Sequence, residues 1–323
     1  MILFVLLNLI HLLFIATYFK KHLNYSFKLN FSFRKHHKFK EIMTFCLFMI
    51  LGTGSGVLVT KLDTVMLESI TSNKGFVGIY TIALSIAAFI EMPRRPISQI
   101  TVPIIAKDLA NNNIEKVSIL YKKSSLNLMI IGAVMFSLIW INIDFVLNLI
   151  ASTSNNDTYK TGKYIVFFLG LAKLFDLALG INSEIIHNSK YYKWNIILMP
   201  FLAIITIALN YYFITKYNSA TGAAIATFFS ILLYNIMRTI LVSVKLKMLP
   251  FSKEYFLTIP FIFIPFILDY TILPIEMNIW LKMIFDSFFV ILFFCLPVYL
   301  LKISPDINKM VNSILRNYLK LKV

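Results

Sequence analysis

The sequence is poor in charged residues and poorest in acidic ones. Only 14% of its 323 residues are Asp, Glu, Lys or Arg, and 15 acidic residues face 31 basic ones. Soluble domains carry roughly a quarter charged residues, so this composition argues against a soluble fold. Hydrophobic residues take the place of the missing charge and make up 59% of the chain. The composition is that of a membrane protein.

Cysteine is scarce as well. The two cysteines, Cys46 and Cys295, both lie within apolar segments. A disulfide framework needs paired, accessible cysteines in an oxidising compartment, so we exclude one here. We interpret both cysteines as small buried hydrophobic residues.

The chain also lacks the motifs of enzymes. It contains no Walker A loop, no nucleophile elbow and no Asp-x-Asp pair, and its five histidines have no cluster of cysteines or carboxylates beside them. We therefore predict that it is not an enzyme and that it needs no metal or other cofactor. A membrane-embedded glycan polymerase is the enzyme alternative, but the longest outer loop, 151–162, is short for a catalytic loop.

Long apolar segments recur from one end of the chain to the other. A helix needs about 20 apolar residues to cross a bilayer. This predicts an all-α fold, a polytopic membrane helix bundle of about nine transmembrane helices. The nine segments are 2–19, 41–70, 75–106, 126–150, 163–187, 195–214, 221–244, 255–270 and 279–301. We treat 1–323 as a single transmembrane domain with a leading helix (1–19), a six-helix lobe (41–246), two further helices (255–301) and a cytoplasmic amphipathic tail (302–323).

The basic residues predict the orientation. Lys and Arg gather in the short connections, with 21 on one side of the predicted membrane and 4 on the other. This is the positive-inside pattern, which places the C-terminus in the cytoplasm and Met1 outside if the chain starts as given. Because no folded basic domain is present, the net charge of +16 does not indicate nucleic-acid binding.

The tail is predicted to form an amphipathic helix. Ser304 suits its cap and Pro305 its first position. One face of this helix is apolar: Ile307, Met310, Val311, Ile314, Leu315, Tyr318 and Leu321. Such a helix either lies along anionic membrane lipids or packs on its own bundle.

Ionisable residues inside spans are costly and usually face a bundle interior or a watery cavity. The second, third and fifth segments contain most of them: Lys61, Asp63, Glu91, Arg94, Arg95, Lys173 and Asp176. Pro93 and Pro96 predict a kink beside the arginines. The spacing of Glu91 places its carboxylate near both guanidinium groups, and Arg238 is expected to snorkel towards the cytoplasm.

The four cations among these residues exceed the three carboxylates by one. A cavity with two arginines suits a phosphate or a diphosphate, because the planar guanidinium matches those oxygens. The alternative is a set of structural ion pairs that hold the helices in register.

Several short motifs are spread over nearly the whole chain: 59–67, Gly78-Ile79-Tyr80, Glu91-Met92-Pro93, 103–106, 170–173, 182–192 and 222–227. In these motifs the chain resembles Wzx-type polysaccharide flippases, whose superfamily also includes multidrug exporters and exporters of lipid-linked peptidoglycan precursors. Two departures are Glu68, where the family has a small residue, and the absence of a proline before Gly222.

The resemblance implies a bacterial inner-membrane transporter of an undecaprenyl-diphosphate-linked oligosaccharide, used for O-antigen, capsule or exopolysaccharide. Lys61, Arg94, Arg95 and Lys173 would bind the substrate, and Asp63, Glu91 and Asp176 would balance charge or couple an ion. Nine spans match the last nine of a fourteen-helix member, which implies a fragment or a missing N-terminal half as partner, with polysaccharide assembly proteins as other partners. A multidrug or metabolite antiporter and a non-transporting assembly subunit are the alternatives.

Overall fold

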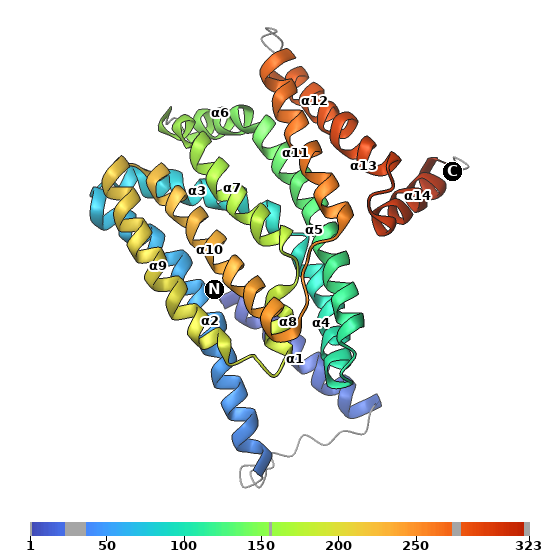
Figure 1. The fold of residues 1–323 in the computed structure, drawn as a ribbon. Coiled ribbons are helices and arrows are strands. Elements are labelled where there is room, and N and C mark those ends of the chain that lie inside the picture. Colours follow the sequence, from blue (N-terminus) through green and yellow to red (C-terminus); the bar gives the residue numbers. More distant parts are fainter. Residues whose placement is uncertain (1, 23–36, 155–156, 273–278, 320–323) are drawn as a thin grey trace. The chain divides into compact units, whose positions relative to one another are not determined.

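The protein is an all-α polytopic membrane helix bundle, seen here in a computed structural model that describes residues 2–22, 37–154, 157–272 and 279–319 (Figure 1). Within these ranges every regular element is a helix. In chain order they are α1 (Ile2–His22), α2 (His37–Thr71), α3 (Lys74–Glu91), α4 (Arg94–Ala110), α5 (Ile114–Ile141), α6 (Ile143–Ser154), η2 (Asp157–Gly162), α7 (Lys163–Ala178), α8 (Asn182–Asn188), α9 (Trp194–Tyr217), α10 (Ala220–Leu246), α11 (Lys253–Ile272), α12 (Ile279–Val290), η3 (Ile291–Cys295), α13 (Leu296–Leu300) and α14 (Pro305–Leu319).

The chain divides into two compact units. The first, Met1–Ile50, contains α1 and the first part of α2. Apolar side chains of α1 such as Leu7, Ile10 and Phe14 are exposed, as expected of a helix that contacts lipid. The second unit, Leu51–Val323, contains all other helices and the whole of the site described below.

Five helices of the described chain are long and apolar enough to cross a membrane, and a sixth crossing results if the bent pair α7 and α8 is one span. The remaining predicted spans lie on the helices α1, α2 and α11. All nine predicted segments therefore fall on helices, whereas nine crossings stay a prediction.

The predicted kink in the third segment is a complete break. Helix α3 ends at Glu91, a turn follows at Met92 and Pro93, and α4 begins at Arg94. Proline ends a helix because it lacks the backbone donor and its ring clashes with the preceding turn. Pro96 lies in the first turn of α4, where no intrahelical bond is lost.

Helix α5 begins earlier than predicted. The sequence indicated a basic loop up to Lys123 and a helix from 126, but α5 begins at Ile114. Lys116, Lys122 and Lys123 therefore lie on the first turns of a 28-residue helix. The span prediction searched for apolar residues and therefore left out these turns, but charged residues on an exposed face do not prevent a helix.

Helix α7 packs against α3, α5 and α10 and holds the centre of the second unit. It is separated from α8 by a bend of 51°. Gly180 lies in this bend with φ +69°, and a Cβ there would lie 3.0 Å from the Cα of Ser125. Ser125 Oγ donates a 2.6 Å hydrogen bond to the Ala178 carbonyl, which the end of α7 leaves without a helical partner. Helix α5 thereby fixes the bend between α7 and α8.

Helices α9 and α10 form an extensively packed hairpin (Figure 1). Asn218 ends α9 in the left-handed conformation, which asparagine tolerates better than most residues. The first turns of α10 carry small buried residues that let the two backbones approach: Ala220, Gly222, Ala223, Ala224 and Ala226.

The tail helix α14 begins at Pro305 as predicted, and the Ser304 hydroxyl caps it by accepting from the Ile307 amide at 3.2 Å. Ser304 Oγ also donates to Asn127 of α5 at 2.6 Å, and the Tyr299 hydroxyl donates to Asn312 at 2.6 Å. The first half of α14 is therefore packed on its own bundle, which was one of the two alternatives. Met310 is exposed.

The close packing of α9 and α10 predicts that one methyl group added at Gly222 lowers the stability of the protein. A Cβ at Gly222 would lie 2.5 Å from the backbone oxygen of Phe213, so Gly222→Ala must push α9 and α10 apart. Such overpacking costs about 1–3 kcal/mol, which thermal unfolding of the purified protein will show as a lowered Tm. Gly78→Ala on α3 is the matched control, because its Cβ would meet only the Tyr159 hydroxyl at 3.8 Å. An unchanged Tm for Gly222→Ala would contradict the close packing.

Candidate functional site

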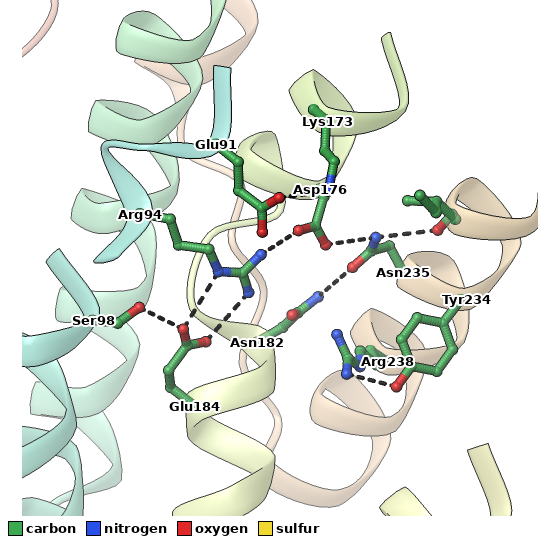
Figure 2. A network of polar contacts seen from close by, with 11 residues as sticks. Glu91, Arg94, Ser98, Lys173, Asp176, Asn182, Glu184, Tyr234, Asn235 and Arg238 are labelled. Atoms are coloured by element: carbon green, nitrogen blue, oxygen red, sulfur yellow. Dashed lines mark hydrogen bonds and ion pairs between the residues drawn. The ribbon is translucent and has the colours of Figure 1, made fainter. Parts of the chain in front are cut away.

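The break between α3 and α4 places a carboxylate and a guanidinium against α7. Glu91 is the last residue of α3, and its Oε2 accepts from Lys173 Nζ of α7 at 2.5 Å. Arg94, the first residue of α4, donates through Nη1 to Asp176 Oδ2 one turn further along α7 (Figure 2). Two ion pairs thus join neighbouring helices. In the first, α3 supplies the carboxylate and α7 the cation, and in the second, α4 supplies the cation and α7 the carboxylate.

Arg94 has a second carboxylate partner. Its Nε and Nη2 each lie 3.5 Å from an oxygen of Glu184 on α8, and Ser98 Oγ donates to Glu184 Oε1 at 2.6 Å. The side chains of Arg94 and Glu184 are each only 13% exposed. Arg94 therefore joins α4, α7 and α8 from a position that is nearly closed to solvent.

Helix α10 completes the network with amides. Asn235 Nδ2 donates to Asp176 Oδ1 at 2.9 Å, so both oxygens of that carboxylate are engaged. Asn182 at the start of α8 reaches Asn235 Oδ1 at 3.5 Å. One turn further along α10, Arg238 Nη2 donates to the Tyr234 hydroxyl at 2.6 Å (Figure 2). We call the residues Glu91, Arg94, Lys173, Asp176, Glu184, Asn235 and Arg238 the charge network.

A polar cavity of about 240 Å³ opens beside the charge network. Helices α7, α9 and α10 form most of its wall. Its lining includes ionisable, hydroxyl and apolar side chains: Asp63, Glu91, Lys173, Asp176, Met199, Leu202, Thr206, Thr227, Ser230, Ile231, Tyr234, Asn235 and Arg238. We call it the polar cavity.

Asp63 lies at the other end of the polar cavity. It is 3% exposed, and its partners are neutral groups from three helices. Asn210 Nδ2 of α9 donates to Oδ1 at 2.6 Å, while the hydroxyls of Thr227 of α10 and Tyr80 of α3 lie 2.9 and 3.1 Å from Oδ2. In the described chain no cation pairs with this carboxyl group.

The predicted site residues separate into two groups. The structure brings Glu91, Arg94, Lys173 and Asp176 together and places Asp63 on the same cavity. Lys61 and Arg95 are exposed, and neither forms an ion pair within the described residues. Of the four predicted cations, one, Lys173, lines the polar cavity, and Arg94 lies in the charge network beside it.

Three expectations about charge are corrected. Glu91 pairs with Lys173 on another helix instead of with the arginines, because the break at Pro93 interrupts the helical spacing. Arg238 does not snorkel, since it is 7% exposed and lines the polar cavity. The charge network has no positive excess, because Glu184 adds a third carboxylate and Arg238 a third cation.

The sequence reading missed Glu184, Asn210, Thr227 and Asn235. A usable signal was present, since asparagines within apolar spans need hydrogen-bond partners when they are buried. Asn182, Asn210 and Asn235 are each 0% exposed and all face this region. Groups of three or more metal-ligating side chains do not occur among the described residues.

Comparison with known proteins gives one match. Residues 1–109 match the family model described as polysaccharide biosynthesis protein. The matched part includes α1 to α4 and the predicted site residues up to Arg95, and it supports the resemblance to the polysaccharide exporter superfamily. Members of that family are typically transporters rather than enzymes. No curated protein and no solved structure matches the chain.

The charge network predicts that substitution of Arg94 lowers the Tm and that substitution of the adjacent Arg95 does not. Arg94→Ala leaves Asp176 and Glu184 without their guanidinium, and breaking a buried pair in this way costs about 3–5 kcal/mol. Thermal unfolding should show a much lower Tm. Arg95→Ala removes an exposed side chain that forms no ion pair in the described part of the chain, and it should leave the Tm unchanged. Equal Tm values for the two variants would contradict this arrangement.

Proposed function

We propose that this chain is a transporter that moves an undecaprenyl-diphosphate-linked oligosaccharide across the bacterial inner membrane for surface polysaccharide synthesis, alone or with a separately encoded N-terminal half. The observation that carries the proposal is the polar cavity, which gathers ionisable groups inside an apolar helix bundle. Charges and broken helices at membrane depth are tolerated where they face protein or a watery pathway. The match of residues 1–109 to polysaccharide biosynthesis proteins supports the substrate class.

Asp63 is the coupling group in this proposal. A buried carboxyl group without a cationic partner is stable when it is protonated or when it binds a cation. Its neutral partners come from α3, α9 and α10, so binding or release of a proton or cation changes the contacts of α2 with three helices at once. This connects occupancy of one site to the packing of the bundle.

Lys61 and Arg95 are the accessible cations of the proposal. Both belong to membrane-spanning segments and both are exposed on the second unit. An exposed cation at membrane depth is costly against lipid, so these residues face water or another part of the transporter. They are available to a diphosphate, whereas Arg94 and Lys173 already have carboxylate partners.

Asp63→Asn tests the coupling role. The amide keeps the size of the side chain but can no longer lose or gain a proton, so export of surface polysaccharide should stop while the protein still folds. Export is measured by surface-glycan staining in cells that lack the native gene, with immunoblots for protein amount. The control is Glu68→Gln, an exposed carboxylate on the same helix. Normal export by Asp63→Asn would remove Asp63 from the mechanism.

Lys61→Ala and Arg95→Ala test substrate contact in the same cells. Because both residues are exposed and neither has an ion-pair partner among the residues that the structure describes, their loss should reduce export without lowering the Tm or the protein amount. Lys107→Ala, an exposed cation on α4, is the control and should export normally. Full export by the Lys61→Ala, Arg95→Ala double variant would show that these cations do not handle substrate.

An antiporter of drugs or metabolites is the second candidate, supported by an apolar pocket of about 530 Å³ between α5, α7 and α11. Phe136, Phe167 and Phe175 contribute to its wall, which suits an apolar compound. The two functions differ in phenotype. Deletion of an antiporter raises drug sensitivity and leaves surface polysaccharide intact, and deletion of the proposed transporter does the opposite.

A further inference from the structure

Arg238 is a buried cation, and no carboxylate of the described chain forms an ion pair with it. Its side chain lies over the Tyr234 ring at 4.0 Å and donates to the hydroxyl of the same residue. Its Nε makes no hydrogen bond, and in the part of the chain that the structure describes Arg238 forms no ion pair. The residue is only 7% exposed and lines the polar cavity.

Burial of such a side chain costs free energy. A buried charge normally requires a partner of opposite sign and hydrogen bonds for its remaining donors. A tyrosine hydroxyl and ring supply only part of this. An anionic group beside Arg238 would therefore supply the charge partner that the described residues do not.

The other cations near the polar cavity are already neutralised. Lys173 pairs with Glu91, and Arg94 pairs with Asp176 and Glu184. The Asp176 carboxylate also accepts from Asn235, so none of its oxygens is left without a partner. Arg238 is the cation of this group whose charge a ligand can meet without breaking an ion pair.

The carboxyl end of the polar cavity lies well away from Arg238. Thr227, which bonds Asp63, precedes Arg238 by eleven residues on α10, which corresponds to about 16 Å along the helix axis. Between these ends lie Ser230 and Thr206, and the Thr206 hydroxyl is buried without a hydrogen-bond partner. A ligand at Arg238 thus meets this cation at a distance from Asp63, beside the Asp176 carboxylate, whose oxygens Arg94 and Asn235 already engage.

We propose that Arg238, held in place by Tyr234, forms at its end of the polar cavity a subsite that binds one oxyanion, a carboxylate or a phosphate group. The volume of the polar cavity, about 240 Å³, lies below the range of roughly 300–1,000 Å³ typical of ligand pockets. The subsite therefore takes one charged group and the few atoms attached to it. The inference rests on the proposed function for its source: an acidic sugar of the glycan or the diphosphate of the lipid carrier.

The test is anion binding by the purified full chain in detergent. Isothermal titration calorimetry is run with glucuronate, with glucose as its neutral counterpart, and with inorganic phosphate. We expect glucuronate or phosphate to bind and glucose not to bind. Arg238→Gln should raise the Kd of the anion at least about tenfold, because hydrogen bonds to a charged group are lost. Lys116→Gln, an exposed cation on α5, should bind as the unmodified chain does.

The outcomes separate the sources and the alternatives. Glucuronate binding assigns the subsite to an acidic sugar, and binding of phosphate alone assigns it to the carrier. Failure of both anions to bind, equal binding of glucose, or an unchanged Kd in Arg238→Gln overturns the proposal. If Arg238→Gln does not fold, Arg238→Lys replaces it, and its point-like ammonium should still weaken anion binding because it lacks the planar fork.

Stability distinguishes a ligand site from a structural contact. Removal of a buried cation without a carboxylate should keep or raise the Tm of the ligand-free protein, whereas removal of a structural partner lowers it. Export in cells is a separate readout. Anion binding that requires Arg238, combined with normal export by Arg238→Gln cells, supports the subsite and counts against its use in the proposed transport.

Discussion

Charges inside an apolar bundle must be paired across helices, and the second unit is organised around that requirement. A lone buried ion costs several kcal/mol, a large part of the stability of a typical domain, so each ion pair also fixes the distance between the helices that supply it. Arg94 connects α4 to α7 and α8, and Lys173 connects α7 to α3. These ion pairs fix the relative positions of helices that apolar packing alone would not determine.

The polar cavity results from an uneven distribution of these pairs. At its centre the carboxylates and cations neutralise one another, while its two ends carry Asp63 and Arg238, each without a partner of opposite charge in the described chain. Both ends lie on the wall formed by α10, whose residues Thr227 and Tyr234 contact them. Under the proposed function, a cation bound at one end and an anion bound at the other would both act on this one helix.

Much of this fold was predictable, and the reasons for the rest are physical. Apolar length predicted the helices, and Pro93 predicted the break after Glu91, because both are local properties of the chain. The partners of Glu91 and Arg94 were not predictable, because they belong to α7 and α8 about 80 residues away. Arg238 was misplaced for a related reason: its position near a span end suggested snorkelling, but the depth of a side chain depends on the packing of neighbouring helices.

The hydrogen bond from Ser125 to the Ala178 carbonyl has a mechanical consequence. Gly180 turns the chain between Asp176 and Glu184, the two carboxylates that hold Arg94, and the close contact with Ser125 prevents this turn from rotating independently of α5. A displacement of α5 must then carry both carboxylates with it as a rigid clamp. Motion at one side of the unit would be transmitted to α4 through Arg94 and Ser98, which both bond Glu184, and through the direct packing of α4 on α5 and α8.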